Sequence, residues 1–163
     1  MVVMGVTGSG KTTVGEALAH AISATYVDGD RLHPQANIAK MSAGIPLDDA
    51  DRWPWLAKVG ETLRQRPAPV IVGCSALKRA YRDFITERAG APVLFIYLNG
   101  SRELISKRMH ERTGHFMPTS LLDSQFATLE VPGEDENAMA VAIDAPLDQI
   151  VADIAAKFGE RPT

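Results

Sequence analysis

The sequence has little that would link it to a membrane, to nucleic acid or to an oxidising compartment. Its 163 residues contain one cysteine, Cys74, so no internal disulfide can form, which suits a reducing cytoplasm. The formal net charge is −3, whereas nucleic acids and anionic membranes favour an excess of lysine and arginine. No apolar run approaches the roughly 18 residues of a membrane-spanning helix. We therefore expect a cytoplasmic protein whose partner is neither a membrane nor a nucleic acid.

Short apolar runs alternate with helical patterns along the whole chain. Continuous apolar runs predict strands that are buried on both faces. The predicted strands are residues 2–4, 25–27, 70–74, 93–98 and 139–143. One of the intervening helices is expected from about residue 54 to residue 66. Five strands separated by helices predict a single α/β domain, residues 1–163, with a parallel sheet covered by helices on both faces.

A glycine-rich segment follows the first predicted strand. It matches the pattern G-x-x-x-x-G-K-[ST], in which backbone N–H groups cradle phosphates at a helix N-terminus. An ordinary glycine turn before a helix is the alternative, but the full pattern in this context favours a nucleotide triphosphate site. Lys11 would reach the β- and γ-phosphates, and the Thr12 hydroxyl would ligate Mg²⁺. The predicted ATP-binding residues here are Gly5, Val6, Thr7, Gly8, Ser9, Gly10, Lys11, Thr12 and Thr13.

Two signatures of other nucleotide-binding proteins are missing. The apolar run 70–74 ends without the acidic residue that P-loop ATPases usually carry there, and the sequence contains no Asn-Lys-x-Asp guanine motif. Both absences count against a P-loop ATPase or a nucleotide switch, which stay as the rival class. Such a protein would hydrolyse nucleotide without needing a small acceptor.

An acidic turn, Asp28-Gly29-Asp30, ends the second predicted strand. Beside a P-loop, one carboxylate can hold Mg²⁺ through water while the other accepts the proton of an attacking hydroxyl. A plain Asp-Gly turn is the alternative. The pair resembles the Asp-x-Asp of shikimate kinase and related small-molecule kinases. That resemblance implies that Asp28 is the acid on the metal side and Asp30 the base on the substrate side.

A basic helical segment supplies candidate cations for a closing lid at about residues 108–120. Arg108 and Arg112 are four residues apart and share a helix face, and the Gly114 break follows. Similarity to adenylate and shikimate kinases implies that Arg108 stacks on adenine, that Arg112 reaches the transferred phosphoryl group, and that the loop at Pro146 lies against the adenine. A solvated basic face and a simple strand-to-helix turn are the alternatives, and His115 is a weaker candidate.

The stretch from Asp28 to Leu56 narrows the choice among families of small-molecule kinases. Its motifs are DGDRLHPQANIAKM and GIPLDDADRWPWL, and CSALK, GHF and QFATLE follow in order. Together they resemble the P-loop gluconokinases over nearly the whole chain. The resemblance implies a three-layer α/β/α kinase fold with strand order 2-3-1-4-5, and a homodimer is plausible on the same ground. It implies ATP-dependent phosphorylation of D-gluconate with Mg²⁺; a shikimate- or nucleotide-directed kinase of the same fold is the nearest rival.

The same stretch carries the candidate acceptor site. Arg52 can clamp a carboxylate through its two-pronged guanidinium, and Lys78 adds positive charge. Asp30, His33 and Asn37 offer hydrogen bonds to hydroxyl groups. Alternatives exist here too: Arg52 could pair with Asp48 or Asp49, and His33 could cap a helix. The expected catalytic residues are Lys11, Asp30 and Arg112, and the expected metal ligands are Thr12 and Asp28.

Overall fold

The structure, a computed structural model, describes residues 1–113 and 119–159. Five strands form one parallel sheet in the order β2-β3-β1-β4-β5, which confirms the predicted fold class and strand order. The strands are β1 (Val2–Met4), β2 (Thr25–Asp28), β3 (Val70–Gly73), β4 (Phe95–Asn99) and β5 (Ala138–Ala142). The central strand β1 pairs with β3 on one side and β4 on the other, and all three of its residues are buried.

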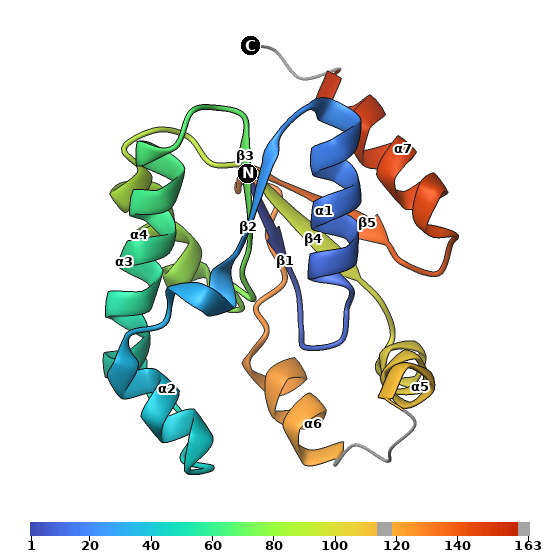
Figure 1. The fold of residues 1–163 in the computed structure, drawn as a ribbon. Helices are drawn as coiled ribbons and strands as arrows, with labels where there is room; N and C mark the ends of the chain where they lie inside the picture. The colour runs from blue at the N-terminus through green and yellow to red at the C-terminus, as the bar shows by residue number, and fades with distance from the viewer. Residues whose placement is uncertain (114–118, 160–163) are drawn as a thin grey trace.

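Helices cover both faces of this sheet (Figure 1). The helices α1 (Lys11–Ile22) and α7 (Leu147–Gly159) lie on one face, and α3 (Asp49–Gln65) and α4 (Arg79–Ala89) lie on the other. Because neighbouring strand residues point to opposite faces, Val3 joins the core under α1 and α7, whereas Val2 and Met4 join the core under α3 and α4. Two apolar layers therefore fix the sheet between its helices.

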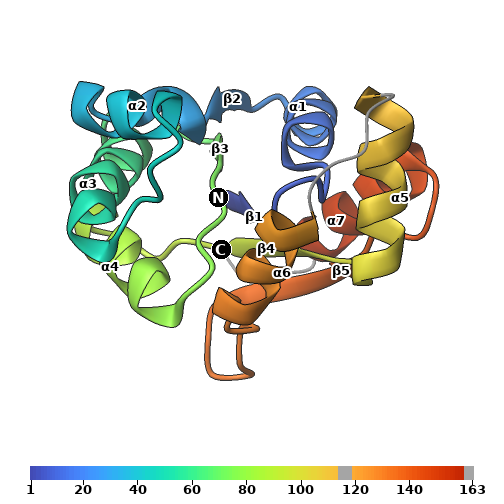
Figure 2. The ribbon, with the colours of Figure 1, turned by 90° about the horizontal axis from the view of Figure 1, so that it is seen from below.

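The remaining helices gather at the end of the sheet where the parallel strands finish (Figures 1 and 2). In open α/β sheets this carboxyl end is where ligands bind. The elements there are the short 3₁₀ helix η1 (Gly29–Leu32), α2 (Gln35–Ser42), α5 (Arg102–Thr113) and α6 (Thr119–Thr128). In the described part of the chain, no helix has the length and apolar character needed to cross a membrane.

Helix α3 begins at Asp49, so the expectation of a start near residue 54 was wrong. Asp48 and Asp51 cap the helix reciprocally: the Asp51 N–H donates to Asp48 Oδ1 at 2.8 Å, and the Asp48 N–H donates to Asp51 Oδ2 at 3.0 Å. The apolar pattern does not reveal this polar first turn. The earlier start places Asp49 and Arg52 on a helix that faces α4.

Candidate active site

The P-loop runs from the end of β1 into α1. Gly10 is the N-terminal cap of α1 with φ 97°, and no side chain caps the helix, so the N–H groups of its first turn and the positive end of its dipole are available to phosphate. Gly8 has φ 79°, and a Cβ there would come within 2.4 Å of Met109 Cγ on α5. The backbone and this close approach therefore both require glycine at position 8.

Lys11 lies over this loop. Its Nζ donates to the carbonyl oxygens of Gly5, at 3.1 Å, and Val6, at 3.0 Å. Burial lowers the pKa of Lys11, and the nearby charges of Asp30 and Asp28 oppose that shift. The ammonium group is thus held beside the P-loop with its bonds made to neutral carbonyls, where a phosphate would be the stronger partner.

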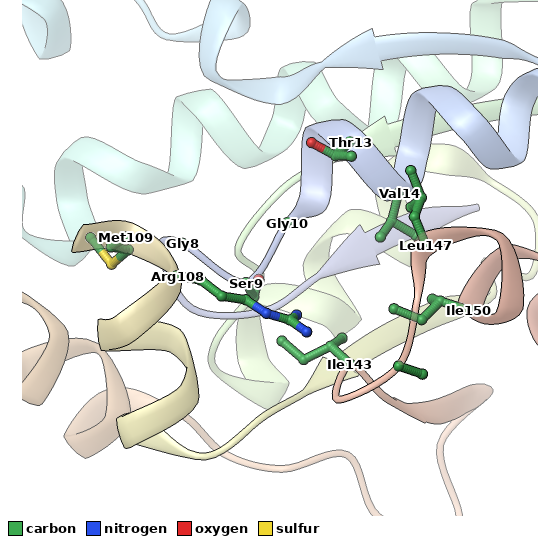
Figure 3. Close-up of a pocket in the computed structure, with 11 residues that line it drawn as sticks. Gly8, Ser9, Gly10, Thr13, Val14, Arg108, Met109, Ile143, Leu147 and Ile150 are labelled. Carbon is green, nitrogen blue, oxygen red and sulfur yellow. The ribbon is translucent and has the colours of Figure 1, made fainter. Parts of the chain in front are cut away.

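A cavity of about 270 Å³ opens beside the P-loop (Figure 3). Arg108 reaches into it from α5, and Figure 3 shows its guanidinium between Ser9 and Ile143. Apolar walls beneath a planar cation suit an adenine ring. The lining residues are Gly8, Ser9, Gly10, Thr13, Val14, Arg108, Met109, Ile143, Ala145, Leu147 and Ile150.

The structure changes one detail of this cavity relative to the sequence-based expectation. Pro146 is exposed and does not line it, whereas its neighbours Ala145 and Leu147 do. Sequence reasoning also missed Met109, Ile143 and Ile150, because apolar residues next to strands and helices look like core. The predicted loop is in place, but its apolar side chains rather than the proline form the wall.

The two carboxylates of the acidic turn lie at the end of β2. The Asp28 side chain caps η1 by accepting from the Asp30 N–H at 3.0 Å. A Cβ at Gly29 would come within 2.2 Å of the Gly73 carbonyl oxygen, so glycine lets the ends of β2 and β3 approach each other closely. Both carboxylates then act electrostatically on Lys11. The structure therefore brings Asp28, Asp30 and the P-loop lysine together.

A charged cluster forms where α3 meets α4. Arg52 Nη1 lies 3.5 Å from Asp49 Oδ1 and 3.4 Å from the Tyr81 hydroxyl. Lys78 Nζ lies 3.6 Å from Asp49 Oδ2. The Tyr81 hydroxyl donates to Asp49, and burial together with this bond raises the pKa of Tyr81 to about 12. Two cations share one carboxylate here, so the cluster keeps a positive charge that could bind an acidic substrate.

This cluster was only partly expected. The prediction assigned Arg52 and Lys78 to the acceptor and allowed Asp49 as a partner of Arg52, and the structure makes that pair while leaving Arg52 32% and Lys78 36% exposed. Arg52 and Tyr81 line a cleft together with Trp55, Ser75 and Gln125. Tyr81 gave no functional signal in the sequence, because a tyrosine in an amphipathic helix usually belongs to the core.

His33 and Asn37 also meet, but Asn37 is turned inward. Its Nδ2 donates to the Asp51 carbonyl oxygen at 2.9 Å and lies 3.1 Å from His33 Nδ1, and the residue is 3% exposed. His33 stacks on Trp55 at 4.2 Å between ring centres, and the Trp55 indole donates to the Gly29 carbonyl oxygen. Asn37 thus joins α2 to α3 and holds His33, and Trp55, which is 5% exposed, packs beneath the His33 ring.

Two expected residues lie outside this description. Arg112 belongs to α5 by its backbone, but its side chain and all of His115 are outside the described residues. Among the residues that are described, no cluster of three or more His, Cys, Asp or Glu side chains could hold a metal. A kinase magnesium ion is bound largely by phosphates and water, so the lack of such a cluster does not count against the prediction of Thr12 and Asp28 as its protein ligands.

Comparisons with known proteins find relatives that match nearly the whole chain. The family described as an AAA domain matches residues 1–132. The chain is 44% identical to a gluconokinase of Gluconobacter oxydans, covering 97% of this chain and 90% of that one. It is 47% identical to the thermoresistant gluconokinase of Escherichia coli, over 93% and 88%. The crystal structure of a gluconokinase from Sinorhizobium meliloti superposes with a TM-score of 0.86 at 50% identity, over 98% and 96%.

Proposed function

The chain belongs to the gluconokinase family, and on this basis we propose that it transfers the γ-phosphoryl group of ATP to the 6-hydroxyl of D-gluconate. The products are ADP and 6-phospho-D-gluconate. The observation that carries the proposal is the pair of cations, Arg52 and Lys78, held around Asp49 at the same end of the sheet as the P-loop. A P-loop alone indicates nucleotide, whereas Arg52 in the wall of the neighbouring cleft, with Lys78 beside the same Asp49 carboxylate, adds a place for a small carboxylate.

The residues divide the reaction between them. Arg52 and Lys78 bind the gluconate carboxylate, and His33, held by Asn37 and Trp55, offers a hydrogen bond to a hydroxyl. Asp30 accepts the proton of the 6-hydroxyl group of gluconate. At the same time the oxygen of that hydroxyl bonds to the γ-phosphorus of ATP, and the bond between the γ-phosphorus and the β–γ bridging oxygen breaks. Lys11 and the N-terminus of α1 stabilise the negative charge on the phosphates.

Four further assignments complete the proposal. Mg²⁺, held by Thr12, Asp28 and the phosphates, would neutralise charge on the transferring group. Arg108 would pack against adenine in the apolar cavity of Figure 3. The resemblance to related kinases implies that Arg112 reaches the transferred phosphoryl group. The resemblance to related kinases further implies that about residues 108–120 form a lid within a single kinase domain, and such a lid would exclude water from the reaction.

The test is an acceptor panel. ADP release is followed with ATP and Mg²⁺ in the presence of gluconate, shikimate, AMP or no acceptor, and the sugar product is identified by mass. Release that depends on gluconate and yields a monophosphorylated sugar acid is the expected result. ADP release that depends on shikimate or AMP would show that the protein is a kinase with a different acceptor. Equal release without any acceptor would overturn the kinase proposal in favour of an ATPase.

A further inference from the structure

Gln125 connects the P-loop to the acceptor cleft. It lies on α6, which sits between α4 and α5 at the carboxyl end of the sheet (Figure 2). Its Oε1 accepts a hydrogen bond from the backbone N–H of Thr7 at 2.9 Å, across 118 positions of sequence. Thr7 is in the P-loop, whose N–H groups normally serve phosphate. A side chain from a distant helix therefore controls one donor of the phosphate cradle.

The same side chain borders the acceptor cleft. Gln125 lines it together with Arg52, Ser75 and Tyr81. The Ser75 carbonyl oxygen accepts from the N–H of Gly5 at 3.3 Å, so this cleft directly adjoins the P-loop. Gln125 consequently stands between the two places that the proposed function assigns to nucleotide and acceptor.

The chemistry of the bond fixes the orientation of the amide. A backbone N–H can only donate, so the group that faces Thr7 must be the carbonyl oxygen of Gln125. The NH₂ group is then at the other end of the amide. Within the described residues it donates no hydrogen bond, and the side chain is half-buried at the cleft. Gln125 is partly buried and its Nε2 is not a buried atom without a partner, so water can serve this donor until a ligand oxygen in the cleft replaces it.

The end of α6 that carries Gln125 is firmly held. Leu122 is buried in the core, and just past the helix the N–H of Glu130 donates to the Leu77 carbonyl oxygen at 2.8 Å. Arg82 Nη2 donates to the carbonyl oxygen of Glu130. Gln125 is therefore fixed relative to the loop that carries Lys78, which is the condition for an amide that must meet reacting atoms within a few tenths of an ångström.

We infer that Gln125 takes part in phosphoryl transfer, holding Thr7 of the P-loop through Oε1 and donating from Nε2 to the oxygen atoms that meet between nucleotide and acceptor. The inference rests on the proposed function for the identity of the acceptor. In this inference the Nε2 group of Gln125 donates a hydrogen bond at the place where negative charge develops during phosphoryl transfer. The Oε1 atom is then needed to position the P-loop, and the Nε2 atom is needed for the reaction.

The test compares Gln125→Met, which removes both ends, with Gln125→Glu, which keeps an oxygen for Thr7 and removes the donor. In both variants kcat should fall about 10²-fold. In Gln125→Met the KM for gluconate and the affinity for ADP should each change by less than about threefold. Gln149→Met is the matched control, because the amide side chain of Gln149 on α7 donates only to the side chain of Asp153 among the described residues and lies outside both cavities. It should keep the wild-type kcat.

A second readout needs no acceptor at all. The amide signal of Thr7 in the NMR spectrum should move in Gln125→Met and stay near its wild-type position in Gln125→Glu. A kcat within about threefold of wild type for Gln125→Glu would limit the residue to a structural hold on the loop and overturn the inference. If gluconate fails as a substrate of the wild-type protein, the proposed function fails, whereas the Thr7 signal and the kcat with the acceptor found in the panel still decide the role of Gln125.

Discussion

Where the phosphates are proposed to bind, the protein offers main-chain groups and Lys11 from one continuous segment, whereas on the acceptor side it offers charged side chains from separate elements. The P-loop and the start of α1 are continuous in sequence, and their N–H groups need no side chain to bind phosphate. Arg52, Lys78 and Tyr81 instead come from α3 and from the loop and helix that follow β3, and they meet around Asp49. Nucleotide binding is therefore built into local backbone, while acceptor recognition depends on long-range packing.

The largest expected effect separates chemistry from binding. Asp30→Asn should reduce kcat by about 10³-fold, because an amide cannot accept the proton of the attacking hydroxyl. The affinity for ADP, measured by calorimetry, should stay at the wild-type value, since Asp30 belongs to the acceptor side. Asp148→Asn, an exposed change in the first turn of α7, is the control and should alter neither quantity. Wild-type turnover by Asp30→Asn would remove this residue from the mechanism.

The next effect tests what holds the acceptor side together. The Arg82 and Glu136 side chains are only 1% and 8% exposed, and Arg82 also bonds to the carbonyl oxygens of Ala76 and Leu77. Ala76 has φ 46°, so this ion pair holds a strained loop next to Lys78. Arg82→Met should lower the free energy of unfolding by about 3 kcal/mol, because it leaves Glu136 buried and unpaired.

A neighbouring arginine provides the control for this experiment. Arg79 pairs with Asp135 at 2.7 Å, but the two side chains are 48% and 66% exposed. Arg79→Met should therefore cost less than about 1 kcal/mol in urea unfolding. Equal losses for the two variants would mean that the buried pair contributes no more than a surface one, and the acceptor side would not depend on it.

Substrate selectivity is the third point of comparison. Arg52→Ala should raise the KM for gluconate by about 10- to 100-fold, the usual worth of a charged hydrogen bond, and leave the KM for ATP nearly unchanged. Arg64→Ala, at the exposed far end of the same helix, should change neither constant. A gluconate constant unaffected by the loss of Arg52 would assign that side chain to pairing with Asp49 alone.

A nucleotide-side variant should give the converse result. Gly8→Ala forces alanine into a left-handed conformation and against Met109, at a cost of about 1–2 kcal/mol, so the affinity for ADP should fall about tenfold. Gly44→Ala is the control: its φ of 74° is similar, but nothing lies within 4 Å of an added Cβ. It should cost stability without changing ADP binding. Equal ADP affinity in both variants would contradict the assigned fit at Gly8.

The smallest effect concerns pH. Burial lowers the pKa of His33, with Asp30 opposing and Arg52 adding to the shift, so the folded protein binds a proton less readily than the unfolded chain. Stability from this group is therefore present above the ordinary histidine pKa of about 6.5 and declines as the pH falls below it. When the pH is lowered from 7.5 to 5.5, the Tm of the wild type should fall slightly more than the Tm of His33→Asn. Parallel curves for the two proteins would contradict this.

Many residues of the proposed nucleotide site could be predicted, because short contiguous sequence motifs specify them. The P-loop pattern pointed to Lys11 and Thr12, and the alternation of apolar runs and helices predicted five parallel strands. The order of those strands, which the structure confirms, came from the resemblance to the gluconokinases. The acidic turn at the end of β2 was found for the same reason, since a short motif carries it. The helix start at Asp49 was missed, because a polar capping box leaves no trace in apolar periodicity.

Tertiary structure alone decided the side-chain relationships. Asp49 and Tyr81 are 32 positions apart and Thr7 and Gln125 are 118 apart, and no local pattern reports such contacts. A parallel sheet brings the ends of all its strands to one edge, so the residues that follow them become neighbours only once the sheet has formed. The sequence by itself therefore determined the loop that is proposed to bind phosphate, whereas packing determined which side chains surround the proposed acceptor cleft.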